Sequence, residues 1–418
     1  MKRTNNFISR GLIGLLTGIL FLSVSCDRIT YEQEVMAKVA VFKTMAEIRK
    51  EFVGTKDGVE LQSTGKIYIY KDFLLINEPL KGIHFYNNSN PAKPEKITFL
   101  AVEGTSDFAI KDDVLYTDNY ADLLLFDLKN IAKPTLMKRV EDVFKTVNTV
   151  WGWKPMNGTK VVAGWKDSLV TYKNTREHTP FVKYDTNINY DGNSGGTGQA
   201  GSLARFTISK NHLYTVDISD LNWFDISNKN TATYVDKMRL SGLLETIFPY
   251  KDNLFIGTTQ GMHIISLENP AAPKKISTFA HFRACDPVVV NDKYAFVTLR
   301  SGIECGGGSN ELQVIDIADL SNPKLKLTQA LKSPYGLGLS GNMVYLTEGM
   351  NGFRSFAFEE GQQLSLKEVQ NLPNMMSYDV IPGPKSMIVI GPKKICQYDY
   401  QDKSNIKELG CINITPGS

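Results

Sequence analysis

The chain has 418 residues, of which 42% are hydrophobic and 22% charged, a composition typical of a globular protein with a sizeable core. Three of its 47 basic residues, Lys2, Arg3 and Arg10, lie in the first 25 residues, which contain no acidic residue. The remaining 44 basic residues balance the 44 acidic ones, so we expect no basic surface for a phosphate backbone and no nucleic-acid partner.

Residues 1–25 are predicted to be a signal peptide. The apolar run Gly11–Leu22 follows a basic start and is short for a membrane span. The small residues Ser23–Ser25 then precede Cys26, which resembles the lipobox of bacterial lipoproteins, although Ser23 stands where the common pattern has Leu. The resemblance implies lipid attachment at Cys26 and contact with a membrane through that anchor. It also implies that the protein is located in the cell envelope, as an outer membrane lipoprotein facing the periplasm or the cell surface. The alternative is an ordinary secretory signal.

Residues 26–60 are predicted to form a tether, a strand and a short helix. The strand is Val39–Phe42. Thr44 and Glu47 have the spacing of a capping box, which predicts a helix that continues to about Phe52. We expect the strand to pair near the last of the repeats that follow and to help close the fold.

From residue 61 to residue 418 one local pattern recurs. A polar turn is followed by an apolar strand, a short turn and a second strand, which often ends in Asp before Asn-Pro or Pro. The clearest copies begin at Lys71, Lys111, Asn211, Lys251 and Asn291, two weaker ones begin at Gly341 and Lys385, and a degenerate one spans Gly158–Tyr172. Further apolar strands flank these pairs. Four short strands in a unit of about 40–50 residues form a propeller blade. The sequence therefore predicts an all-β fold, a β-propeller of four-stranded blades with about eight blades, or seven.

The strand sequences Leu123–Leu128 and Leu312–Ile317, each with prolines soon after, resemble the LVIVD-repeat family of bacterial and archaeal propellers. The resemblance runs from about Lys66 to the end of the chain, and the order of segments resembles exported lipoprotein members from Bacteroidetes. It implies a propeller. Because that family carries no agreed biochemical activity, the resemblance implies little about function.

Four cysteines remain after Cys26, and an even number in an exported chain permits two disulfides. Cys396 and Cys411 lie at equal distances from the centre of the turn 402–405, so they are predicted to face each other on paired strands and to be bonded. Cys285 and Cys305 are expected on one face of the propeller and should form the second bond. A zinc site is the alternative, but close CxxC spacing and nearby histidines are missing.

No motif of a known catalytic class is present, and the five histidines are scattered. Four aspartates recur at one place in the blade, directly before a turn: Asp127, Asp225, Asp316 and Asp399. They are predicted to cap that turn rather than to act as catalytic acids or bases. We expect no cofactor, no catalytic site and no metal site.

One Gly-rich insert contains a weak calcium candidate. Asn187, Asn189 and Asp191 place oxygen ligands at alternate positions before a glycine, but the twelfth position is Gly198 instead of Glu. A flexible loop is the alternative interpretation.

Three long loops are expected on one face of the propeller: Thr175–Ser202, Arg300–Asn310 and Glu348–Gly352. Long loops on a rigid scaffold are where binding usually occurs. The candidate binding face consists of Arg205, Arg283, Arg300 and Glu348. We therefore predict a non-enzymatic binding or assembly module for a protein or glycan partner. Two alternatives remain: the loops plug the tunnel mouth, or the protein is an enzyme that acts on extracellular glycan or peptide in the tunnel.

Overall fold

The computed structural model describes residues 32–149, 152–155, 160–173, 182–183, 204–280, 287–301 and 309–415. The chain divides into two compact units, residues 1–41 with 165–189 and residues 42–164 with 190–418. A three-stranded sheet has the order β13-β1-β14, with β1 (Glu32–Thr44), β13 (Lys160–Lys173) and β14 (Val182–Lys183). Within the described ranges, no helix is long and apolar enough to cross a membrane.

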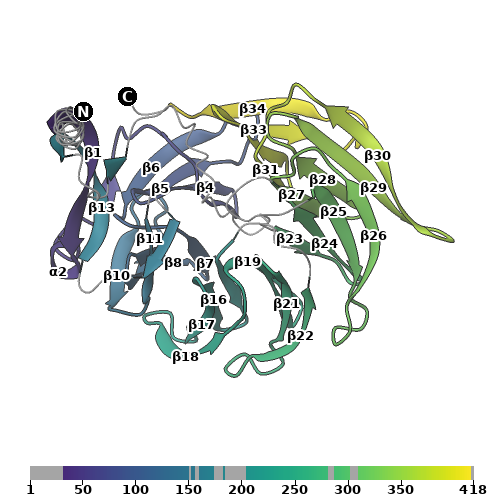
Figure 1. The fold of residues 1–418 in the computed structure, drawn as a ribbon, viewed down its shortest axis with the longest axis horizontal. Coiled ribbons are helices and arrows are strands. Elements are labelled where there is room, and N and C mark those ends of the chain that lie inside the picture. The colour runs from purple at the N-terminus through teal and green to yellow at the C-terminus, as the bar shows by residue number, and fades with distance from the viewer. Residues whose placement is uncertain are drawn as a thin grey trace, which may run out of the picture. The chain divides into compact units, whose positions relative to one another are not determined.

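The second unit contains seven antiparallel sheets, each built from four consecutive strands (Figure 1). The first blade consists of β3 (Ile67–Tyr70), β4 (Phe73–Glu78), β5 (Gly82–Asn87) and β6 (Glu95–Ala101), with β2 (Gly54–Lys56) added beyond β6. The second consists of β7 (Phe108–Lys111), β8 (Val114–Asn119), β9 (Asp122–Asp127) and β10 (Thr135–Val140). The third consists of β15 (Phe206–Ser209), β16 (His212–Val216), β17 (Asp220–Asp225) and β18 (Thr233–Arg239). A hairpin of β11 (Thr146–Thr149) and β12 (Gly152–Pro155) lies between the second and third blades in sequence.

The remaining four blades follow without a further sheet between them. The fourth consists of β19 (Leu244–Tyr250), β20 (Asn253–Thr258), β21 (Gly261–Ser266) and β22 (Lys274–Ala280). The fifth consists of β23 (Val288–Val290), β24 (Tyr294–Leu299), β25 (Glu311–Asp316) and β26 (Lys324–Ala330). The sixth consists of β27 (Leu337–Ser340), β28 (Met343–Thr347), β29 (Phe353–Glu360) and β30 (Leu364–Leu372). The seventh consists of β31 (Asp379–Pro382), β32 (Met387–Ile390), β33 (Lys394–Asp399) and β34 (Lys407–Asn413). The innermost strands, such as β7, β19, β23, β27 and β31, lie nearest the centre in Figure 1.

The middle strands of each blade carry the core. The side chains of Leu123–Phe126 in β9, for example, are fully buried, because both faces of this strand pack against neighbouring blades. The outer strands are mostly exposed, with a few half-buried residues. In all seven blades the outer strand also shifts its register against the third strand. Such a bulge strengthens the local twist of a sheet edge.

An apolar cluster fills each of the seven junctions between neighbouring blades. At the closing junction, Ile67 and Ile76 of the first blade pack with Ile388 and Ile395 of the seventh. The backbone N–H of Thr415 also donates to the carbonyl oxygen of Leu61, at 2.8 Å. The ring is therefore closed mainly by side-chain packing between its first and last blades.

The sequence prediction of a propeller is confirmed, and the ring has seven blades. The degenerate eighth unit, Gly158–Tyr172, is not a blade. Its two apolar stretches belong to the single strand β13, because Gly164–Asp167 between them continues the extended backbone and does not turn. The expected position of the N-terminal strand is also wrong, since β1 pairs with β13 and β14 and not with the last blade.

The predicted helix is present as α2 (Met45–Ile48) and is shorter than expected. Its capping box is formed: the Thr44 hydroxyl accepts the Glu47 N–H, and the Glu47 carboxylate accepts the Thr44 N–H at 2.7 Å. Met45 and Ile48 are buried against Tyr120 and Ala121. The helix therefore packs on the turn between the second and third strands of the second blade.

Candidate functional site

Three of the four residues predicted for the binding face lie in the described ranges. The backbone N–H of Arg205 donates to Asp107 Oδ2 at 2.6 Å. Arg300 is buried, with its guanidinium carbon 3.8 Å from the ring centre of Tyr335. Glu348 is fully buried and accepts the Lys332 N–H at 2.5 Å. Arg300 and Glu348 thus both contact the segment 332–335. The role of this face in binding stays a prediction.

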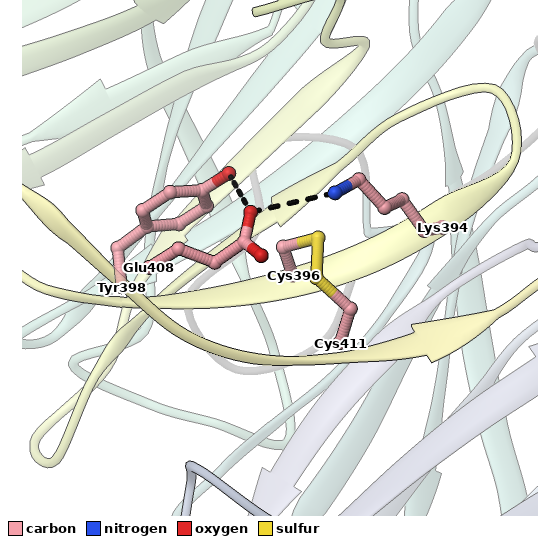
Figure 2. The surroundings of a disulfide bond; sticks show 5 residues. All are labelled: Lys394, Cys396, Tyr398, Glu408 and Cys411. Carbon is pink, nitrogen blue, oxygen red and sulfur yellow. Dashed lines mark hydrogen bonds and ion pairs between the residues drawn. A yellow bond between two sulfur atoms is a disulfide. The ribbon is translucent and has the colours of Figure 1, made fainter.

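One of the two predicted disulfides lies in the described residues and is confirmed. Cys396 and Cys411 are register partners on β33 and β34, with Cα atoms 4.1 Å apart and the sulfur atoms bonded (Figure 2). The other candidates lie outside the described residues: Cys26, Arg283, Cys285, Cys305, Asn187, Asn189 and Asp191.

The prediction that the repeated aspartates cap turns is confirmed. In each case Oδ1 accepts the backbone N–H two residues further on, at 2.8 Å for Asp127 and Asp225 and at 3.0 Å for Asp316 and Asp399. These four carboxylates belong to turns in different blades, and none forms a catalytic pair with another in the described structure.

A buried ion pair lies at the start of the innermost strands. Lys66 Nζ is 2.6 Å from Asp107 Oδ1, and both side chains are almost fully buried. Lys66 also donates to the Phe206 carbonyl oxygen at 2.9 Å, and Asp107 Oδ2 accepts the Phe206 N–H at 2.9 Å. The pair therefore joins the first, second and third blades across the long insert that separates the second from the third in sequence. Burial lowers the pKa of Lys66.

Asp118 continues this network behind the ion pair. Its carboxylate accepts the N–H of Ser106 at 2.7 Å and that of Asp107 at 3.1 Å, and it contacts the Ser106 hydroxyl at 2.5 Å. Burial raises the pKa of Asp118 to about 7. A hollow of about 290 Å³ adjoins Lys66 between the innermost strands, and none of the residues that line it is a histidine or a cysteine. Lys66 and Asp107 are thus bonded between blades, and Asp118 is bonded within the second blade.

A larger hollow, the rim pocket, lies at the outer part of the first blade and has a volume of about 690 Å³. It is enclosed by the segment that contains β2, by the end of β6 and by the turn between β4 and β5. The lining residues are Glu51, Phe52, Lys56, Gly58, Val59, Glu60, Gln62, Glu78, Leu80, Lys81, Phe99, Ala101, Glu103 and Ala163. This volume is in the range of small-molecule sites.

Glu78, one of the residues that line the rim pocket, is bonded to two neighbouring side chains. Glu78 Oε2 is 2.8 Å from Nε2 of the buried His84, and Glu78 Oε1 accepts a hydrogen bond from Lys81 at 2.7 Å. Lys81 also donates to Gln62 Oε1 at 2.6 Å. Burial alone raises the pKa of the Glu78 carboxyl, but the hydrogen bonds from His84 and Lys81 outweigh it and hold this pKa below its usual value. Burial lowers the pKa of His84, which favours the neutral imidazole. Glu78 is only 1% exposed, so this carboxylate lies beneath the pocket surface and holds Lys81 in place there.

An exposed aromatic ring stands beside this network. Phe52 is 59% exposed although it lines the pocket. Its ring lies against Gly54, where a Cβ atom would come within 3.0 Å, and Lys56 Nζ lies 5.4 Å from the ring centre. A side chain at position 54 would therefore crowd the tip of this ring.

Two ion-pair groups hold the wall of the pocket in place. Lys43 pairs with Glu51 at 2.8 Å and with Glu103 at 3.1 Å. Arg49, directly after α2, donates two hydrogen bonds to the buried carboxylate of Asp122, at 2.9 and 2.7 Å. The segment that carries Phe52 is thus anchored on both blades beneath it.

Sequence reasoning missed the rim pocket. Glu78 and His84 flank one short turn, so their proximity could have been recognised once β4 and β5 were paired. His84 and His263 occupy equivalent strand positions in two blades. His263 is bonded to Thr278 and to the Ser241 carbonyl oxygen, whereas His84 is bonded to a pocket carboxylate.

No family model matches the chain. An uncharacterized protein of Archaeoglobus fulgidus is 24% identical over 267 residues, which is 59% of this chain and 41% of that protein. The chain therefore spans about two-fifths of the length of this relative.

Solved structures show the same fold at low sequence identity. The computationally designed protein Ika8 aligns over 86% of this chain and 90% of its own, with a TM-score of 0.52 and 8% identity. A protein of unknown function from Desulfotomaculum acetoxidans aligns over 83% of this chain and all of its own, with a TM-score of 0.52 and 10% identity. Dihydro-heme d1 dehydrogenase NirN in complex with DHE aligns over 92% and 74%, with a TM-score of 0.50 and 11% identity. These similarities support the β-propeller fold alone.

Proposed function

We propose that this protein is a lipid-anchored propeller of the cell envelope that binds glycan without chemical turnover, with the rim pocket as its binding site. In this proposal Cys26 carries the lipid, and the chain is a member of the LVIVD-repeat family, like the exported lipoproteins of Bacteroidetes that it resembles. The observation that carries the glycan assignment is the exposed ring of Phe52 beside the fixed side chains of Gln62, Glu78 and Lys81.

A sugar has an apolar face of C–H groups and an edge of hydroxyls, and this pocket offers a partner for each. The exposed Phe52 ring supplies an apolar surface for the C–H face of a sugar. The exposed side chains of Gln62 and Lys81 supply polar groups for the hydroxyls, and the buried carboxylate of Glu78, itself bonded to His84, holds Lys81 in place. A concave site with a few fixed polar groups suits a small polar ligand better than a flat protein surface.

The charges of the pocket favour neutral or basic sugars. Four glutamates and two lysines line it, so a ligand carboxylate would meet an excess of negative charge. We therefore expect hexose or aminohexose oligosaccharides to bind in preference to uronic-acid oligosaccharides.

The proposal that the protein does not turn over its ligand rests on the bonds that its buried titratable groups make. Lys66, Asp107 and Asp118 have shifts or positions typical of active sites, but the bonds of Lys66 and Asp107 join neighbouring blades, and Asp118 bonds the start of β7 within the second blade. The NirN neighbour is an enzyme by its description, and the enzyme alternative would place a reaction in the tunnel. That alternative requires these groups to leave bonds on which the blade junctions depend.

The test is a printed array of hexose, aminohexose and uronic-acid oligosaccharides, probed with the parent chain and three variants. Phe52→Ala and Lys81→Met should each weaken binding to the preferred glycan by roughly tenfold, which corresponds to about 1.4 kcal/mol. Phe42→Ala is the matched control, since Phe42 is 52% exposed but does not line the pocket. Failure to bind any sugar class, or equal losses in Phe42→Ala and Phe52→Ala, would contradict the proposal.

A further inference from the structure

The disulfide of the last blade has a carboxylate beside it. Cys396 lies on β33, and Cys411 and Glu408 lie on β34. The two sulfur atoms and a carboxylate oxygen of Glu408 all lie within 4.8 Å of one another. Across the described part of the chain, this is the one group of three histidine, cysteine, aspartate or glutamate side chains with so close a spacing.

The bulge of β34 brings Glu408 to this face of the sheet. In a regular strand, residues three apart point to opposite faces, so Glu408 and Cys411 would be separated by the sheet. Here the register shifts after the pair Gln397–Gly410, and Glu408 stands opposite Tyr398. Because Cys396 and Tyr398 are two residues apart on β33, their partners Cys411 and Glu408 share their face. Figure 2 shows the carboxylate directed towards the disulfide.

Two neighbours fix the carboxylate. The Tyr398 hydroxyl donates to Glu408 Oε2 at 3.2 Å, and Lys394 Nζ lies 3.4 Å from the same oxygen (Figure 2). Cys396 is buried, whereas Cys411 is half-buried and Glu408 is exposed. The group is therefore ordered on one side and open to solvent on the other.

We propose that, after reduction of the disulfide, Cys396, Cys411 and Glu408 bind one thiophilic divalent cation of the Zn²⁺ class. Reduction needs two electrons and two protons, which a dithiol reductant supplies as it becomes a disulfide. The two protein thiols then lose one proton each to solvent and bind the cation as thiolates. Glu408 is the third protein ligand, and water takes the fourth position of a tetrahedral site.

The geometry permits this change without movement of the strands. Sulfur atoms that share a tetrahedral zinc ion at about 2.3 Å are roughly 3.8 Å apart, a separation that rotation of the two side chains can produce. The site would combine three negative ligands with one divalent cation, and Lys394 would balance the remaining negative charge from its place beside Glu408. The β33–β34 pair would thus stay cross-linked, by the disulfide when oxidised and by the cation when reduced.

The inference is independent of the glycan proposal and is tested with Co²⁺ as the probe. The full chain with Cys26→Ser, Cys285→Ser and Cys305→Ser keeps Cys396 and Cys411 as its two cysteines. Titration of the reduced protein without oxygen should produce thiolate-to-cobalt charge-transfer absorption that saturates at one equivalent, and Zn²⁺ should displace it. The oxidised protein should give no such band.

Variants assign the ligands. A further Cys411→Ser change should abolish the band, and Glu408→Gln should weaken Co²⁺ binding by at least roughly tenfold. Glu359→Gln, at an exposed position on the neighbouring blade, is the matched control and should bind as the parent does. A reduced protein that keeps its circular dichroism but gives no band would overturn the proposal, and so would an unchanged affinity in Glu408→Gln. If reduction unfolds the protein, Zn²⁺ should restore the native spectrum, and failure to do so would also overturn it.

Discussion

The buried pair of Lys66 and Asp107 should be essential for the stability of the ring. Replacing Lys66 by Met removes the cation and its bond to the Phe206 carbonyl oxygen, while Asp107 stays buried. Removing one partner of a buried ion pair typically costs about 3–5 kcal/mol, because an uncompensated charge remains. The bonds that Asp107 accepts from backbone N–H groups of the third blade lead us to expect the lower part of that range.

A second lysine–aspartate pair provides the control. Lys385 Nζ and Asp72 Oδ1 are also 2.6 Å apart and also join two blades, but the side chains are 45% and 60% exposed. Solvent screens such a pair, so Lys385→Met should cost less than about 1 kcal/mol.

The assay is equilibrium unfolding in urea at pH 7, followed by circular dichroism and by tryptophan fluorescence. Lys66→Met should reduce the free energy of unfolding by about 3 kcal/mol relative to the parent, and Lys66→Met with Asp107→Asn should recover part of the loss. Equal costs for Lys66→Met and Lys385→Met would refute the reasoning, because burial would then not determine the contribution of the pair.

Three further predictions use the same chain. The pKa of Asp118 is about 7 in the folded protein, against 3.8 ordinarily. Between these two values the folded protein keeps a proton that the unfolded chain releases. The contribution of Asp118 to stability therefore falls as pH rises from about 4 to about 7. Asp118→Asn should remove that fall, roughly 4 kcal/mol, in unfolding measured across the pH range, and an unchanged pH profile would contradict it. Cys26→Ser should move the protein from the membrane to the soluble fraction, and firm membrane retention would disprove the anchor. Deletion of Asp191–Gly198 should leave both glycan binding at the rim pocket and the melting temperature nearly unchanged; a loss of glycan binding would favour the face of the long loops as the binding site.

Local chemistry made most of the fold predictable. The turn between the third and fourth strands repeats because an Asp side chain caps it, and Asp127 and Asp316 do so with the same hydrogen bond. Cys396 and Cys411 could be paired by counting outward from their turn, because a hairpin fixes its own register. The possible eighth blade was inferred where Val161 and Leu169 suggested two strands, because Gly164 and Asp167 between them are typical of a turn, but β13 continues through both.

The rim pocket could not be predicted, because it depends on contacts between distant segments. The segment that carries Phe52 is held by the bond between Arg49 and Asp122, which are 73 residues apart in sequence. The side chain of Glu78 becomes a fixed carboxylate only when Lys81 and Gln62 meet around it. Arg300 and Glu348 follow strands in long loops of the sequence, and their burial depends on tertiary packing that a local pattern does not show.

Hydrogen–deuterium exchange with the preferred oligosaccharide tests the central claim most directly, since it locates binding without a substitution. The account predicts slower exchange in peptides that cover 51–62 and 78–81, and unchanged exchange in the turns that the repeated aspartates cap. Protection confined to 300–301 and 348–352, or to the innermost strands, would place the ligand on the opposite blades or in the tunnel and would contradict the account.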